Sequence, residues 1–361
     1  MESKRYYTME NYFVNRMRRF GRQMSNRSET VEEHIAWKNE LRARLREAIG
    51  LNRMQTCDLK PEVLEKTACN GYTRRKIVIQ TEPEVYMPFF MLIPDDIKPG
   101  ERRPAVLAPH GHFEKAKLTV AGCAQSPEAV AQVRESRGDY GVQLVREGFV
   151  VFCPDARGFG ERRERRFQDG GECPPFVDGV GCMTCMELNR IAISLGQSVV
   201  AMWVWDLMRL IDYVQTCPEC DAERLGCGGL SGGGLQTLWL MALDERVKAG
   251  IVSGYFYGFE DALFRALVCC SCNYAPHVWE MIDVSDLAAL AAPRSLTIET
   301  GTRDTLNGIK GLQNVIPYVE RAGEAYALYG AKENLVHDIF EGEHRWNGER
   351  SIERIKRDLG L

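Results

Sequence analysis

The sequence predicts an α/β protein with a mostly parallel central sheet, helices on both faces of the sheet and an N-terminal helical extension. Short, continuously apolar segments that end in Gly or Pro recur from about residue 104 onward, as is typical of buried parallel strands. Amphipathic helical segments lie between them, and this alternation favours right-handed crossovers in one sheet. Before Arg75 the sequence shows no strand pattern.

Composition and charge argue against binding to nucleic acid or to a membrane. The chain has 361 residues, is 45% hydrophobic and 27% charged, and carries a formal net charge of −4. This charge predicts no general attraction to nucleic acid. No secretory signal and no long uncharged apolar stretch is present, so we expect no membrane partner. The 13 cysteines are odd in number and scattered, which favours reduced thiols and a cytoplasmic location. The sequence leaves the oligomeric state open.

The N-terminal extension is predicted to cover residues 1–68 and the catalytic domain residues 69–361. The clearest helix of the extension begins near Thr30, which is followed three residues later by Glu33. This spacing is a capping box, in which the two residues satisfy each other's backbone amides. We expect the extension to pack on the main body.

The strands and helices of the main body follow in order. From Arg75, the segment "RKIVIQTEPEVYMPFFMLIPDD" alternates, turns and alternates again, which predicts an antiparallel hairpin. Buried strands are predicted near residues 104, 148, 224, 248, 294 and 334. Helices are expected over 127–148 and, as one long helix with an apolar stripe, around 187–215.

A glycine-rich turn carries the strongest chemical signal. Gly229-Leu230-Ser231-Gly232-Gly233 fits G-x-S-x-G, with an apolar strand before it and a helical segment after it. This is the pattern of a nucleophile elbow, where the glycines leave room for crossing backbones and the serine hydroxyl is exposed. A phosphate-binding loop would need Lys and then Ser or Thr after the last glycine, but Leu235 and Gln236 follow.

A nucleophilic serine needs a histidine base, and three histidines follow it in the sequence. The chain order expected for this fold is Ser, acid, His. His277 precedes the strand that should supply the acid, and His337 fits the alternation of a strand. His344 follows that strand in a turn-forming loop, so it is the predicted base.

The acid that orients the base is predicted to be Asp304. It follows the strand "LTIETG" in a loop, between Ser231 and His344 in the chain. Glu299 is the alternative, but it lies on the strand itself. Asp283 and Asp286 stand at a helix start and are expected to be solvated or to cap that helix.

The oxyanion of the tetrahedral intermediate needs two backbone N–H donors. One is predicted to be Gly232, which follows the nucleophile. The second is predicted to be His112 in "VLAPHGHF", with Gly111 as the alternative. The pair His110 and His112 at i,i+2 spacing is weak evidence for a metal, and none is expected there.

The cysteines are not expected to bind a cofactor or a metal. Two C-x-x-C pairs, Cys182/Cys185 and Cys217/Cys220, are separated by more residues than a shared zinc site usually allows. Cys269, Cys270 and Cys272 are interpreted as core or loop thiols. The sequence therefore predicts a protein without cofactor or metal.

Together these segments resemble the α/β-hydrolase superfamily, and most of all its bacterial acetyl-xylan-esterase-like and dienelactone-hydrolase-like group. The resemblance covers residue 75 to the end. It rests on "HGH" (110–112), "PDARGFGER" (154–162), "GLSGGG" (229–234), "CNY" (272–274), "ETGTRD" (299–304) and "FEGEHRWNG" (340–348). It implies an α/β-hydrolase fold and a cofactor-free serine esterase that acts on short acyl esters, often of acetylated sugars.

The expected partner is thus a small-molecule or oligosaccharide ester. Dienelactone hydrolases use a cysteine nucleophile, whereas this elbow carries Ser231, so that activity is not expected. A thioesterase or peptidase on the same fold is the alternative enzyme. A non-catalytic binding protein is the third reading, and an intact serine, acid and histidine in the expected order argue against it.

Overall fold

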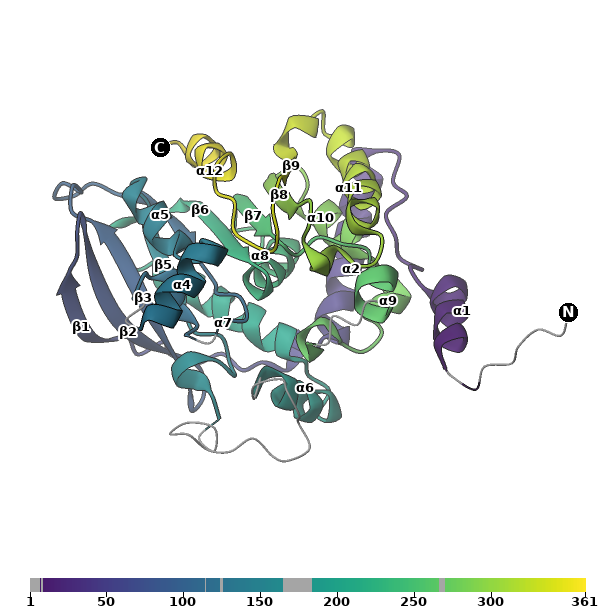
Figure 1. Cartoon of the computed structure of the whole chain (residues 1–361), viewed down its shortest axis with the longest axis horizontal. Coiled ribbons are helices and arrows are strands. Elements are labelled where there is room, and N and C mark those ends of the chain that lie inside the picture. Colours follow the sequence, from purple (N-terminus) through teal and green to yellow (C-terminus); the bar gives the residue numbers. More distant parts are fainter. Residues whose placement is uncertain (1–6, 8, 114, 124–125, 165–183, 266–269) are drawn as a thin grey trace, which may run out of the picture.

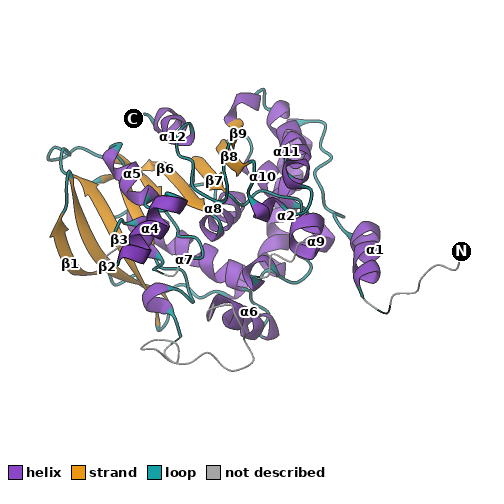
Figure 2. Cartoon of the chain, viewed as in Figure 1, coloured by secondary structure: helices purple, strands orange, loops and turns teal. Residues whose placement is uncertain are grey.

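A computed structural model of the chain describes residue 7 and residues 9–113, 115–123, 126–164, 184–265 and 270–361. Its centre is a nine-stranded sheet with the order β1-β2-β3-β5-β4-β6-β7-β8-β9, which twists across the molecule (Figure 1, Figure 2). The strands are β1 (Glu62–Ala68), β2 (Tyr72–Glu82), β3 (Val85–Pro94), β4 (Arg103–Leu107), β5 (Val150–Pro154), β6 (Cys220–Leu230), β7 (Ala249–Ser253), β8 (Ser295–Gly301) and β9 (Leu335–Phe340).

The pairing of the strands confirms a mostly parallel sheet. From β5 through β4 to β9, every neighbouring pair is parallel. The predicted hairpin is β2 and β3, which pair antiparallel, and β3 joins β5 in the same sense. Crossover connections place the carboxyl ends of the parallel strands at one edge, where open α/β sheets hold their ligands.

The expectation that no strand precedes Arg75 is wrong. β1 lies entirely before that residue, within the segment predicted to be helical, and β2 begins at Tyr72. Among the described strands, β1 pairs only with β2, and an irregularity between Val63 and Glu65 interrupts the register. Six of its seven residues are exposed, so it lacks the apolar alternation by which a half-buried strand is recognised.

Alternate residues of the central strands face two separate core layers. Phe89 and Met91 of β3 contribute to one layer, and Phe90 and Leu92 contribute to the other. This period of two follows from the pleat, which directs successive side chains to opposite faces. Helices must therefore cover both faces, as predicted.

Helices α3, α5 and α12 cover one face, and α7, α8, α10 and α11 cover the other. On the second face α2 packs outside α8, and α1 packs on α9 at the end of the molecule away from β1 (Figure 1). The described helices are α1 (Glu10–Phe20), α2 (Val31–Ala48), α3 (Lys117–Val120), α4 (Pro127–Ser136), α5 (Tyr140–Arg146), α6 (Thr184–Ser194), α7 (Val199–Val214), α8 (Gly232–Leu243), α9 (Val278–Met281), α10 (Val284–Ala291), α11 (Ile316–Leu328) and α12 (Ser351–Leu359).

The single long helix expected around 187–215 is instead two helices, α6 and α7, bent by 102°. Gly196 has a φ of 73°, which ends the first helix, and the Ser198 hydroxyl caps the second by accepting from the Ala201 amide. The predicted apolar stripe on α7 is buried throughout. Among the described helices, none is by itself long and apolar enough to cross a bilayer. The α6–α7 pair meets those criteria jointly, by length and composition alone.

The N-terminal segment packs on the main body through α2. The predicted capping box is present, with the Glu33 amide donating to Thr30 Oγ1 at 3.2 Å and the Glu33 side chain accepting from the Thr30 amide. Leu41 and Leu45 of this helix are fully buried in the larger core layer. The sheet begins at Glu62, so the boundary at residue 68 stays a prediction that cuts after its first strand.

Candidate active site

Ser231 lies at the junction between β6 and α8, as the elbow pattern predicts. The strand ends at Leu230 and the helix begins at Gly232. Ser231 has φ 60° and ψ −120°, a backbone conformation that non-glycine residues rarely adopt and that marks functional positions. Its amide donates to the Ser253 carbonyl at the end of β7 over 2.8 Å. The turn therefore holds Ser231 at the carboxyl edge of the sheet.

The glycines of the elbow are required by close backbone approaches. A Cβ atom on Gly229 would lie 2.6 Å from the Pro109 carbonyl oxygen and 2.7 Å from the Gly233 carbonyl carbon. A Cβ on Gly233 would lie 2.2 Å from the same Pro109 oxygen. This confirms the prediction that these glycines leave room for crossing backbones, and it shows that the crossing partner is the 109–112 loop.

The predicted base and acid are in contact. His344 Nδ1 and Asp304 Oδ2 are 2.8 Å apart, and the Asp304 side chain is almost fully buried. The other carboxylate oxygen, Oδ1, accepts from the Leu306 amide at 2.9 Å, which fixes the plane of the carboxylate. Because an ionised Asp304 can only accept, Nδ1 carries the proton and Nε2 of His344 is left as the basic nitrogen.

Gly254 links the histidine to the nucleophile. A Cβ on this residue would lie 2.8 Å from His344 Cε1, so the imidazole rests directly on the glycine backbone. Gly254 follows Ser253, whose carbonyl accepts from the Ser231 amide. The end of β7 therefore places the elbow and the imidazole on the same short stretch of chain. Gly254 was not predicted as a site residue, although it is the glycine that ends the apolar segment "KAGIVSG".

Glu299, the alternative acid, has a different position. It is fully buried on β8, and its carboxylate accepts from the amides of Asn347 and Gly348 at 3.0 and 2.8 Å and from the Ser351 hydroxyl. Burial raises the pKa of Glu299 above its usual range. The side chain thus anchors the loop that carries His344, as a positioning residue.

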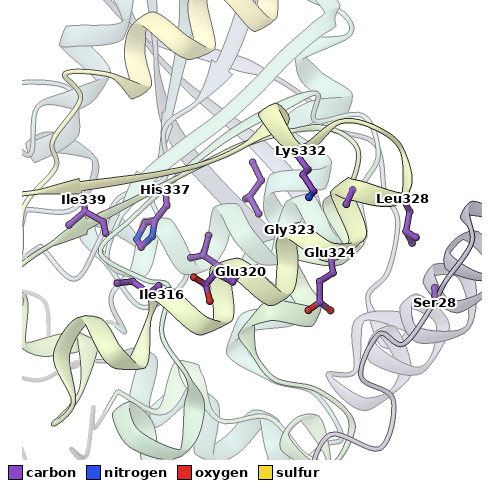
Figure 3. Close-up of a pocket in the computed structure, with 12 residues that line it drawn as sticks. Ser28, Ile316, Glu320, Gly323, Glu324, Leu328, Lys332, His337 and Ile339 are labelled. Atoms are coloured by element: carbon purple, nitrogen blue, oxygen red, sulfur yellow. The ribbon is translucent and has the colours of Figure 1, made fainter.

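The other two histidines after Ser231 are elsewhere. His337 is on β9, as predicted, and its Nε2 lies 3.0 Å from Thr300 Oγ1. Its ring faces a groove of about 700 Å³ that α11 lines with Ile316 and Glu320 (Figure 3). His277 precedes α9 and pairs with Glu280 at 2.7 Å on the surface.

The two other carboxyl groups that were considered in the sequence, Asp283 and Asp286, form the capping box of α10. Capping was one of the two expected roles. Both residues are buried, so the other expectation, that they are solvated, is wrong.

Both predicted oxyanion donors lie beside the elbow. Gly232 is the first residue of α8, where backbone amides have no partner within the helix. His112 approaches it closely, because a Cβ on Gly232 would lie 2.8 Å from the His112 ring. Within the described part of the chain, neither amide has an assigned protein acceptor. Both amides therefore remain available to an acceptor other than the described protein groups.

The loop that carries His112 is held from several sides. Tyr140 donates its hydroxyl to the Pro109 carbonyl at 2.6 Å, and Gln236 donates to the His110 carbonyl at 3.1 Å. The Ala156 amide donates to His110 Nε2 at 3.1 Å, so the proton of this neutral ring is on Nδ1. Burial lowers the pKa of His110 to about 4, which keeps the ring neutral. His110 is therefore part of the support of the loop.

The surroundings of the His112 side chain were not predicted from the sequence. Its Nε2 lies 2.9 Å from Cys270 Sγ and 3.6 Å from Cys272 Sγ. Cys185 Sγ is 3.5 Å from Cys270 Sγ. The spacing of Cys270 and Cys272 in "CSCNY" was visible in the sequence, but only the fold brings them to the histidine. Cys182 and Cys269 lie outside the described residues.

The sheet order, the elbow after β6 and the acid and histidine after β8 and β9 define an α/β-hydrolase. The chain belongs to the Abhydrolase family, whose model matches residues 13–335. This match confirms the resemblance to the α/β-hydrolase superfamily and the predicted fold class. It includes Ser231 and Asp304 and ends before His344.

Solved structures share this fold at low sequence identity. A Bacteroides fragilis protein described as a "putative acetyl xylan esterase" superposes with a TM-score of 0.74 and 18% identity, over 95% of this chain and 84% of that one. A glucuronoyl esterase from Solibacter usitatus gives 0.64 and 16%, over 90% and 92%. At these identities the likeness establishes the fold.

One curated relative also matches, the Bacillus subtilis (strain 168) protein named "Putative hydrolase YtaP". The two chains are 22% identical over 191 residues, which is 48% of this chain and 52% of the relative. The match thus spans about half the length of that curated relative.

Proposed function

We propose that this protein is a serine esterase that hydrolyses short-chain carboxylic esters, acetyl esters of sugars foremost. The observation that carries the proposal is the 2.8 Å contact between His344 and a buried Asp304, on the same sheet edge as the strained Ser231. The names of the two structural neighbours, a "putative acetyl xylan esterase" and a glucuronoyl esterase, support ester hydrolysis as the reaction.

The proposed reaction is a two-step acyl transfer. His344 Nε2 takes the proton from the Ser231 hydroxyl as its oxygen attacks the ester carbonyl carbon, and Asp304 stabilises the resulting imidazolium. The amides of Gly232 and His112 then bind the oxyanion, where one donor contributes about 3–4 kcal/mol to transition-state stabilisation. The protonated histidine gives its proton to the departing alcohol. Water, activated by the same nitrogen, releases the carboxylic acid from the acyl-serine.

The test combines hydrolysis rates with covalent labelling. Wild type and Ser231→Ala are compared on p-nitrophenyl acetate and on longer acyl chains, with Ser194→Ala as a control because that serine is exposed on α6. We expect Ser231→Ala to lose about 10⁴-fold or more in kcat, and the control to keep wild-type activity. A fluorophosphonate reagent should label the wild type at Ser231 only. Ester hydrolysis that survives Ser231→Ala would refute the mechanism.

The same enzyme preparation separates the alternative reactions. An acyl thioester and a peptide substrate are assayed beside acetylated xylo-oligosaccharide at equal concentration. A kcat/KM for the sugar ester that exceeds both others would support the proposed substrate class. A higher kcat/KM for the thioester or the peptide would refute the sugar ester as the substrate class and favour thioesterase or peptidase activity. Labelling at Ser231 would still identify the nucleophile in that case.

A further inference from the structure

Four soft donor groups meet beside the oxyanion loop. The sulfur of Cys270 lies 2.9 Å from His112 Nε2, 3.0 Å from Cys272 Sγ and 3.5 Å from Cys185 Sγ. The donor atoms of His112, Cys270 and Cys272 all lie within 4.8 Å of one another. The three cysteines are buried. We call these four residues the thiol–imidazole cluster.

Thiolate sulfur and imidazole nitrogen are the donors that zinc selects in structural sites, and Cys₃His is one of its common ligand sets. With zinc–sulfur and zinc–nitrogen bonds of about 2.3 and 2.0 Å, tetrahedral donors lie about 3.5–3.8 Å apart. The contacts in the cluster span 2.9 to 3.6 Å. An ion would therefore require the donor atoms of His112, Cys270 and Cys272 to move apart by less than about 1 Å. Cys185 contacts Cys270 but lies outside the group of donor atoms that are all within 4.8 Å of one another, so its side chain would have to move toward His112 and Cys272 to complete the tetrahedron.

The scaffold of the cluster is already fixed by hydrogen bonds that a metal would not disturb. Asn189 of α6 donates to the carbonyls of Ser271 and Tyr274 at 2.6 and 2.9 Å. The Ser271 hydroxyl donates back to the Met186 carbonyl of α6 at 3.2 Å. The turn that carries Cys270 and Cys272 is thus fastened to the helix that carries Cys185, and α6 lies beside α7 (Figure 1).

The orientation of His112 is also suited to a ligand. The opposite side of its ring, with Nδ1, packs on the Gly232 backbone, and the ring lies in T-shaped arrangements with Phe159 and Trp203. These contacts leave Nε2 as the nitrogen that faces the sulfurs. A disulfide would consume two sulfurs and give this nitrogen no role, whereas a cation uses all four donors.

We propose that His112, Cys270 and Cys272 bind a thiophilic divalent cation, Zn²⁺ foremost, with Cys185 as the fourth ligand. This inference runs against the sequence-based expectation that the protein binds no metal. The ion would tie together three segments that are far apart in the chain, one of which presents the His112 amide. Its effect on activity rests on the proposed esterase function, because it acts by positioning that amide. The metal site itself does not depend on that function.

The experiment measures metal in the full-length chain after reduction, incubation with Zn²⁺ and desalting. We expect about one zinc ion per wild-type chain, and about a tenfold or greater loss of bound zinc in Cys270→Ser and Cys272→Ser. Cys220→Ser is the matched control, because it removes a buried cysteine that belongs to the pair Cys217/Cys220 and not to the thiol–imidazole cluster. Zinc lost from the control and kept in Cys270→Ser would overturn the location of the site.

A second measurement needs no variant and so remains decisive if the cluster variants fail to fold. X-ray absorption at the zinc edge of the wild-type protein should give sulfur at about 2.3 Å and nitrogen at about 2.0 Å in a three-to-one ratio. A shell without nitrogen, or wild-type protein that retains no zinc, would overturn the proposal. So would a Cys270–Cys272 or Cys185–Cys270 disulfide in peptides from protein kept under cytosol-like reducing conditions. Fluorophosphonate labelling of Ser231 is a separate measurement. Failure of the esterase proposal can therefore be distinguished from failure of the metal proposal.

Discussion

The contact between Gly254 and the imidazole of His344 makes Gly254→Ala a direct test of the site geometry. The added Cβ would lie 2.8 Å from His344 Cε1 and 3.0 Å from its Nδ1. Ordinary contact begins at 3.4 Å, so the ring must move by about 0.6 Å, which is the difference between 2.8 and 3.4 Å. That movement also disturbs the 2.8 Å hydrogen bond to Asp304.

Two separate effects follow from this one methyl group. Gly254 has a φ of 58°, and a side chain in this left-handed region costs about 1 kcal/mol of folding stability. A misplacement of about 1 Å in a reacting group can lower a rate by about 100-fold. We therefore expect kcat to fall by about 10- to 100-fold. The lower folding stability alone would cause a far smaller fall in activity.

The control separates the two effects. Gly330 has a φ of 64°, but a Cβ on it would meet no atom within 4 Å. Gly330→Ala should therefore show a comparable loss of stability in thermal unfolding and keep wild-type esterase activity. Hydrolysis of p-nitrophenyl acetate is measured for both variants well below their melting temperatures. Wild-type kcat in Gly254→Ala would refute the position of the ring, and equal losses in both variants would refute the role of the clash.

Two further comparisons test the acid and the pH dependence. Asp304→Asn should lower kcat by about 10⁴-fold, whereas Glu299→Gln should keep kcat within about tenfold and lower the free energy of unfolding by about 1–3 kcal/mol. If Glu299→Gln lowered kcat for ester hydrolysis more than Asp304→Asn did, Glu299 would be the acid that orients the base. Burial lowers the pKa of His110 and of His337 from 6.5 to about 4, so the unfolded chain binds more protons in that range. The contribution of these histidines to stability should be complete above pH 6.5 and be lost as the pH drops toward 4, by about 3 kcal/mol for the fully buried His110 alone. Urea midpoints that change between pH 7 and pH 5 by the same amount in the wild type and in His110→Asn would contradict this.

The parts of the fold that local chemistry determines were predictable from the sequence. The parallel strands are short, apolar and buried on both faces, and the glycines around Ser231 are needed wherever two backbones cross. Chain order then selected His344 and Asp304, which are now seen in contact. The break between α6 and α7 was missed because one glycine, Gly196, within an otherwise helical pattern does not by itself end a helix.

The thiol–imidazole cluster could not be predicted, because its members come from three distant segments of the chain. Cys185 precedes Cys270 by 85 residues, and nothing in their spacing indicates that they meet. The anchoring role of Glu299 depends likewise on where the loop after β9 returns. Local patterns describe elements, whereas such sites arise from the way in which the elements pack.

The exposed strand β1 has a consequence for behaviour at high concentration. An edge strand offers unpaired backbone groups to which a second molecule can add, the first step of edge-to-edge aggregation. In β1, Glu62, Glu65 and Lys66 would place charges at any such junction, and the irregular register after Val63 would disturb its ladder. The outer margin of the sheet is thereby protected against polymerisation of the folded protein.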